Sequence, residues 1–101
     1  MTEEETYYNR VGRKIKGATQ GQMFGKPCFK VGKKAFCCFY KNCMVFKLTG
    51  EWHQEAMSYD GSELFDPSGK GRAMKEWVQV PYDYKDEWAL LAQKSAEYVS
   101  G

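Results

Sequence analysis

Four cysteines and a single histidine are the residues of this sequence best suited to nucleophilic or metal chemistry. Zinc sites are typically built from paired Cys-x-x-Cys ligands or from added histidines, and neither pattern occurs around Cys28, Cys37, Cys38 and Cys43. A cysteine nucleophile needs a base beside it, and His53 lies in a segment that we expect to form a surface helix. The pattern therefore predicts no metal, no cofactor and no catalytic residue, and it favours cysteines that serve as small buried side chains.

Two of the cysteines could also meet across a hairpin. Gly32-Lys33 suits a two-residue turn, which would pair Val31 with Lys34 and, further from the turn, Cys28 with Cys37. In that register the two cysteines occupy a non-hydrogen-bonded pair, where the side chains of neighbouring strands approach most closely. Oxidation could join them in a disulfide, but reduced thiols are expected in a cytoplasmic protein.

Two other short segments carry residues with chemical potential. Glu63 and Asp66 could act as an acid–base pair, or they could border a turn, in which an Asp before a proline is common. The segment Ser68–Arg72 has glycines and cations that could bind a phosphate, but it lacks the Gly-x-x-x-x-Gly-Lys-Ser/Thr pattern and equally suits a hairpin loop. We therefore do not predict an enzyme, and a small-molecule-binding protein or an enzyme of unrecognised type is kept as a second alternative.

The cations are concentrated in one half of the chain. No Asp or Glu occurs from Thr6 to Gly50, whereas acidic residues outnumber basic ones after that, and the net charge is only +2. The cations of the basic half are Arg10, Arg13, Lys14, Lys16, Lys26, Lys30, Lys33, Lys34, Lys41 and Lys47. Such a chain could present a basic face to nucleic acid or to an acidic protein, or its two halves could neutralise each other across the fold.

The composition is that of one globular domain. With 101 residues, 43% of them hydrophobic and 16% aromatic, the chain can close a single core over residues 1–101. A membrane protein is not expected, because 28% of the residues are charged and no apolar run approaches the roughly 20 residues of a bilayer span. The acidic start, Met1 to Glu5, lacks the basic flank and apolar stretch of a signal peptide, so we expect a cytoplasmic protein.

The periodicity of apolar residues predicts an α+β fold. Thr2 and Glu5 form a capping box that begins an N-terminal helix, and Asp83 is the expected N-cap of the last helix. The segments between and after them alternate with period two or with helical spacing. Expected strands are Met23-Phe24, Cys28–Val31, Lys34–Tyr40, Cys43–Leu48, Leu64-Phe65 and Met74–Val80, and expected later helices are Glu51–Tyr59 and about Tyr84–Val99. The prediction is an antiparallel sheet of about five strands with helices at the N-terminus, in the middle and at the C-terminus.

Both faces of this sheet are expected to be apolar. Alternation places Cys28, Ala35, Cys37, Phe39, Met44, Phe46 and Leu48 on one face, and Phe29, Val31, Phe36, Cys38, Tyr40, Cys43 and Val45 on the other. In the last strand Met74, Val78 and Val80 should point one way, and Lys75, Trp77 and Gln79 the other. Because a small antiparallel sheet usually leaves one face to water, the second face should be covered by a helix, by the C-terminal segment or by another subunit.

Several short blocks resemble the N-terminal domain of the TfoX/Sxy family over residues 8–99. They are Met23-Phe24-Gly25, Pro27 to Val31, Val45 to Leu48, Leu64 to Pro67, and Gly71 to Val78 followed by Val80-Pro81. The resemblance implies an antiparallel α+β fold similar to secretion-chaperone-like domains, and it implies no catalytic residues. Full-length TfoX proteins regulate natural competence and carry a second, C-terminal domain, which has no counterpart in these blocks.

The leading functional hypothesis is a non-enzymatic regulatory or protein-interaction domain. It rests on the two apolar faces, on Trp77 and on the family resemblance, and it favours a protein partner or a homodimer. The alternative is a nucleic-acid-binding accessory module that uses the basic region 10–47. Candidate surface residues are Arg72, Lys75, Trp77, Lys30, Lys34 and Lys47.

Overall fold

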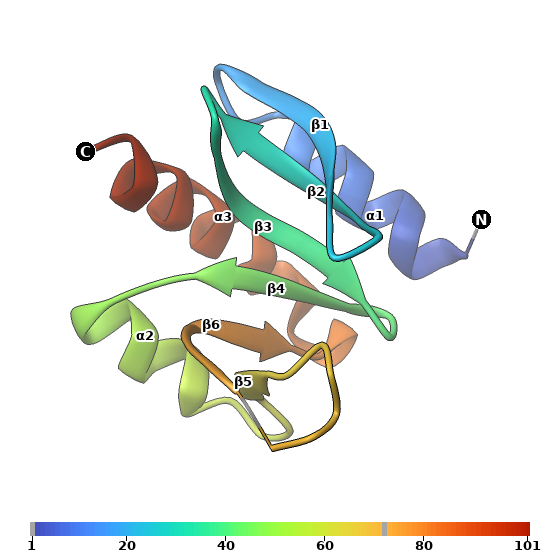
Figure 1. Ribbon diagram of the computed structural model, residues 1–101, viewed down its shortest axis with the longest axis vertical. Coiled ribbons are helices and arrows are strands. Elements are labelled where there is room, and N and C mark those ends of the chain that lie inside the picture. The colour runs from blue at the N-terminus through green and yellow to red at the C-terminus, as the bar shows by residue number, and fades with distance from the viewer. Residues whose placement is uncertain (1, 72) are drawn as a thin grey trace.

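A computed structural model of the chain describes residues 2–71 and 73–101. The chain folds into three α-helices and a six-stranded antiparallel sheet, which confirms the predicted α+β class and adds one strand to the sheet (Figure 1). The elements are α1 (Glu3–Arg13), β1 (Ala18–Met23), β2 (Lys26–Val31), β3 (Lys34–Tyr40), β4 (Cys43–Lys47), α2 (Gly50–Met57), β5 (Glu63–Phe65), β6 (Met74–Val80), the 3-10 helix η1 (Tyr82–Tyr84) and α3 (Lys85–Ser100).

The sheet has the strand order β1-β2-β3-β4-β6-β5, so β1 and β5 are its edges. Helices α1 and α3 lie against the same face of the sheet, and α2 lies beside the end of the sheet that β5 and β6 form (Figure 1). Strand β1 is longer than the expected Met23-Phe24 segment, and the sequence did not indicate the added residues because residues 18–22 carry no apolar alternation. Pairing with β2 extends this strand where local pattern does not predict one.

Helix α1 begins as predicted and packs unusually closely on the sheet. The Oγ1 atom of Thr2 accepts a hydrogen bond of 3.1 Å from the amide of Glu5, which confirms the cap. Tyr8 and Val11 are buried, and Gly12 lies directly over the ring of Phe29. A Cβ atom at Gly12 would stand 2.2 Å from Phe29 Cε2, so only glycine permits this approach.

A β-bulge between β2 and β3 overturns the predicted register. Val31 faces Lys34 as expected, but the register then shifts, so that Cys37 lies opposite Phe29 and Cys38 lies opposite Cys28. The predicted Cys28–Cys37 pair is therefore wrong, because the extra residue at the bulge moves every later residue of β3 by one position.

Because of this bulge, the predicted assignment of residues to the two faces of the sheet is partly wrong. Phe29, Val31 and Phe36 join Cys37 on the face covered by α1 and α3, whereas Cys28 and Ala35 lie on the opposite face with Cys38. Met74 likewise lies on the side of Trp77, away from Val78 and Val80. A second shift in register, between Leu64 and Phe65, accompanies this change.

The second face of the sheet is covered by the sheet itself. Cys28, Cys38, Val45, Phe65 and Trp77 form a second buried cluster there. The rings of Tyr40 and Phe65 lie 5.3 Å apart although β4 and β6 separate their strands, so the twisted sheet brings β3 and β5 together across this face. No residue of a helix belongs to this cluster, so the expectation that a helix or the C-terminal segment covers it is wrong.

Helix α3 is anchored to the sheet by a buried serine. The Ser95 hydroxyl lies within hydrogen-bond distance of the Phe36 carbonyl, of the Lys47 carbonyl at 2.9 Å and of the Lys47 amide at 3.1 Å. The hydroxyl group can donate its single proton to only one of the two carbonyls at a time, and its oxygen accepts a hydrogen bond from the Lys47 amide. Asp83 belongs to η1, and the N-cap of α3 is Tyr84, which makes no side-chain cap, so the predicted Asp83 cap is wrong.

Candidate functional site

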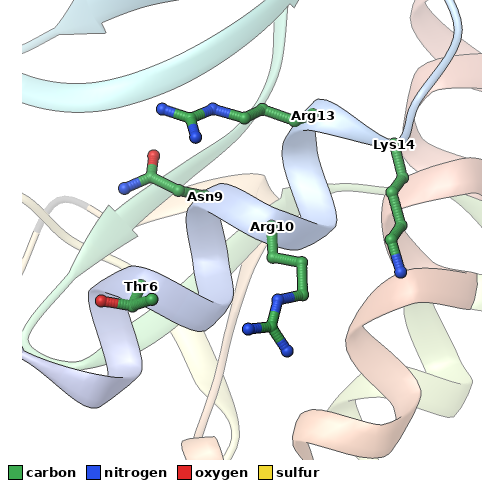
Figure 2. A pocket seen from close by; sticks show the side chains of 5 residues that line it. All are labelled: Thr6, Asn9, Arg10, Arg13 and Lys14. Carbon is green, nitrogen blue, oxygen red and sulfur yellow. The ribbon is translucent and has the colours of Figure 1, made fainter.

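The outer side of α1 carries exposed cations around an open groove. Arg10, Arg13 and Lys14 line this groove with Thr6 and Asn9, and its volume is about 510 Å³. Asn9 and Arg13, one helical turn apart, point to the same side of α1 (Figure 2). Arg10 and Lys14 line a second, smaller cavity between α1 and α3. The helix thus presents guanidinium and ammonium groups on both of its exposed flanks.

The basic half of the chain is not neutralised by close ion pairs. Within residues 2–71 and 73–101 the salt bridges are Lys47–Glu76 at 4.0 Å and Lys94–Glu97 at 3.6 Å. Of the cations between Arg10 and Lys47, therefore, only Lys47 pairs with a carboxylate in the described part of the chain. The alternative in which the two halves neutralise each other by contact is not supported by this geometry.

Lys30 extends its side chain across the edge strand. It lies on β2 opposite Thr19, and its Cε atom is 3.0 Å and its Nζ atom 3.5 Å from the position that a Cβ on Gly21 would occupy. Because Gly21 has no side chain, the Lys30 ammonium group can lie over the backbone of β1 at this residue. We use the name cationic surface for Arg10, Arg13 and Lys14 on α1 together with Lys30, which lies on the opposite face of the sheet beside the same edge strand.

The structure brings two of the other predicted surface residues together. Lys47 and Trp77 are partners in the β4–β6 register, with Lys47 Nζ 6.0 Å from the Trp77 ring centroid. Lys34 is exposed beside the β2–β3 turn, and Lys75 is exposed on β6. Strands β2, β3, β4 and β6 are consecutive neighbours in the sheet, and of the described candidates the register pairs Lys47 directly with Trp77.

Trp77 contributes less exposed area to the predicted site than expected. Trp77 faces away from Val78 and Val80, as predicted, but it is only 7% exposed because the second cluster packs around it. A side chain so buried offers little area to a partner. Arg72 lies outside the described residues.

Cys28, Cys37 and Cys38 are buried core residues, and Cys43 is half-buried. All four are free, and burial raises the pKa of Cys38 to about 12 and the pKa of Cys37 well above its usual range. A thiol held in its protonated form is a poor nucleophile and a poor metal ligand. His53 Nε2 lies 2.8 Å from the Lys75 carbonyl, and no cluster of three metal-ligating side chains occurs in the described residues.

The glycine-rich loop after β5 folds around its own carboxylate. Asp66 accepts hydrogen bonds from the amides of Gly69 and Gly71 and from the Ser68 hydroxyl. These bonds, the Ser68 one above all, lower the pKa of the Asp66 carboxyl. The loop amides that could cradle a phosphate are thus turned toward Asp66, which favours the hairpin-loop interpretation of this segment.

Sequence reasoning missed two surface features. The first is the open edge of β1, whose polar residues gave no strand signal. The second is Phe24, which is 59% exposed at the tip of the β1–β2 hairpin with φ of 54°. Phe24 was expected in a strand, but it lies in the turn beside Gly25, whose own positive φ is the turn signal that the sequence carries.

The described helices include none that is long and apolar enough to cross a membrane. Comparisons of the chain with models of known protein families, with curated proteins and with solved structures find no match.

Proposed function

We propose that this protein is a non-catalytic, cytoplasmic interaction domain that binds an acidic segment of a partner protein through its cationic surface. The observation that carries the proposal is the unpaired charge of the basic half, in which Lys47 alone forms a salt bridge within the described residues. Exposed like charges repel each other and gain free energy when a partner supplies the opposite charge. The resemblance to a regulatory family supports a binding role in place of a catalytic one.

An acidic protein fits the surface better than nucleic acid does. The groove beside Arg10 and Lys85 is also lined by Glu3, and the first turn of α1 carries Glu4 and Glu5 as well. A phosphate backbone needs a continuous track of cations, and these carboxylates interrupt it. A folded or extended protein partner can place its acidic residues against the cations alone.

The aromatic residues of the basic half also argue against base stacking. Tyr40 lies under Lys26 Nζ at 4.9 Å and Lys41 Nζ at 5.3 Å, so its ring already has cationic neighbours. Phe29 and Phe36 are buried in the main core. Stacking platforms for single-stranded nucleic acid require exposed rings in a row, and among these aromatics only Phe24 is largely exposed.

A homodimer through the sheet face loses its main support. The second apolar face is buried within one chain, and Trp77 is buried with it. We therefore place the interface on the charged side of the molecule.

The test is a salt-series titration monitored by fluorescence anisotropy. A labelled glutamate-rich peptide is the probe, and duplex and single-stranded DNA of matched net charge are the competitors. We expect the peptide to bind with an affinity that falls as salt rises, and the double variant Arg13→Glu, Lys14→Glu to lose at least tenfold in affinity.

The matched control changes the same net charge elsewhere. Lys70→Glu with Lys75→Glu lies in the other half of the chain and should weaken peptide binding less than twofold. Equal loss in the two double variants would mean that net charge, and not this surface, governs binding. Stronger binding of either DNA than of the peptide would overturn the proposal in favour of the nucleic-acid alternative.

A further inference from the structure

Strand β1 leaves one long edge of the sheet open. It has six residues and pairs only with β2 among the described strands, and Figure 1 shows it along the border of the molecule. Natural sheets usually protect such an edge with prolines, inward-pointing charges or bulges. Strand β1 has none of these, since its residues are uncharged and its pairing with β2 is continuous. The other edge, β5, has only three residues.

The turn of the hairpin determines which backbone groups face outward. Met23 and Lys26 flank the two-residue turn, so they form a hydrogen-bonded pair, and the alternation along an antiparallel ladder makes Gln22–Pro27 a non-hydrogen-bonded pair. Pro27, which lacks an N–H group, suits that position. By the same alternation the amide and carbonyl groups of Gln22 and Gln20 point away from β2. Ala18 has the same orientation, but its amide already donates to the Ile15 carbonyl at 3.1 Å.

A cation stands on each side of this edge. On one face of the sheet the Lys30 ammonium crosses Gly21. On the other face Gln20 Nε2 donates to Asn9 Oδ1 at 3.3 Å, which brings the Asn9 side of α1 to β1, and Arg13 projects from that same side (Figure 2). An added strand would therefore meet positive charge on both of its faces.

We infer that the acidic partner binds as an extended segment that adds an antiparallel or parallel strand to β1. The amides and carbonyls of Gln20 and Gln22 supply main-chain hydrogen bonds, and Lys30 and Arg13 select carboxylates on the two faces of the added strand. This inference rests on the proposed function and specifies how the partner is held. A second copy of this chain is not the occupant, because pairing β1 with β1 would bring the Lys30 and Arg13 groups of two copies together.

The experiment uses the full chain and a capped eight-residue peptide, Glu-Glu-Thr-Thr-Glu-Glu-Thr-Thr. Paired glutamates place carboxylates on both faces of an extended strand. The blocking variant is Gln22→Pro, which removes one outward amide and is tolerated at an edge strand, and its matched control is Gln22→Val, which keeps the amide. Urea unfolding of both variants checks that each remains folded.

We expect Gln22→Pro to bind the peptide at least about fivefold more weakly than Gln22→Val does, which corresponds to the loss of one main-chain hydrogen bond. A second measurement needs no variant. Hydrogen exchange at the Gln20 and Gln22 amides should slow when the peptide is added, whereas the Gly21 amide, which already faces β2, should change little.

The outcomes separate this inference from the proposed function. Salt-sensitive peptide binding with equal affinity for Gln22→Pro and Gln22→Val would overturn strand addition and leave the cationic surface as the binding site. Absence of peptide binding at low salt would overturn both. Doubling of the mass in solution with slowed exchange at Gln20, in the peptide's absence, would show a second copy on β1 and would also overturn the inference.

Discussion

Replacing Gly12 by alanine tests how closely α1 packs on the sheet. Alanine in place of glycine inside a helix normally stabilises it by about 1 kcal/mol. Here the new Cβ would stand 2.2 Å from Phe29 Cε2 and 2.3 Å from Cδ2. Ordinary carbon–carbon contacts are about 3.5 Å or longer, so helix and ring must separate by more than about 1 Å.

The ring has little freedom to yield. Phe29 is 1% exposed, and its ring lies 5.3 Å from that of Tyr8. Overpacking of a filled core costs about 1–3 kcal/mol, and we take the upper end because the overlap is with a rigid buried ring. Subtracting the helix-propensity gain leaves a net destabilisation of about 2 kcal/mol for Gly12→Ala.

Urea denaturation followed by circular dichroism measures this change, with a thermal midpoint about 8–16 °C lower as an independent readout. A double-mutant cycle with Phe29→Val supplies the control, because valine lacks the ring atoms that meet the new Cβ. In the Phe29→Val background Gly12→Ala should be neutral or stabilising, giving a coupling free energy of at least about 1 kcal/mol. Stabilisation by Gly12→Ala alone, or additive effects, would refute the close contact.

Three other predictions concern buried groups and strain. Ser95→Ala should lower the free energy of unfolding by about 2 kcal/mol, because it leaves a buried amide and carbonyl unpaired, whereas Ser100→Ala at the exposed end of α3 should change it by less than about 0.5 kcal/mol. Phe24→Asn should raise the free energy of unfolding by about 0.5–1 kcal/mol in urea denaturation, because asparagine tolerates the positive φ that phenylalanine adopts there, and a loss would show that the phenyl ring contributes to packing. Burial raises the pKa of Cys38 to about 12 and also that of Cys43, so the folded state holds these protons above pH 9, and the stability that these two thiols contribute should be fully present below that pH and be lost above it. A urea midpoint that is equal at pH 7.5 and pH 10.5 would contradict this.

The sequence predicted correctly those helices and strands whose type and ends depend on residues within the element itself. The Thr2 cap and the bounds of β3 and β6 follow from spacing and turn residues, and the structure confirms them. The Met74–Val80 strand was predicted to the residue because alternation and Pro81 define both its type and its end. These features depend on hydrogen bonds and steric preferences within a few residues of each other.

The candidate site could not be derived in the same way. The concentration of cations before Gly50 was visible, but which of them find a carboxylate depends on where the acidic half folds. Lys30 was predicted to be a surface residue, yet the space that Gly21 leaves for its side chain is known only from the register of β1 on β2. The strand partner of Phe36 could not be predicted either, because a bulge shifts the register without changing the apolar pattern from which a strand is predicted.

By itself the sequence determined the class of fold, the order of most elements and the unequal distribution of charge, because these depend on composition and on short periodicities. Tertiary structure alone decided that the second sheet face is buried, that Trp77 is buried with it and that β1 keeps an open edge between Lys30 and Arg13. The physical reason is that strand pairing and sheet twist join residues far apart in the chain. Their energies depend on partners that no local window contains.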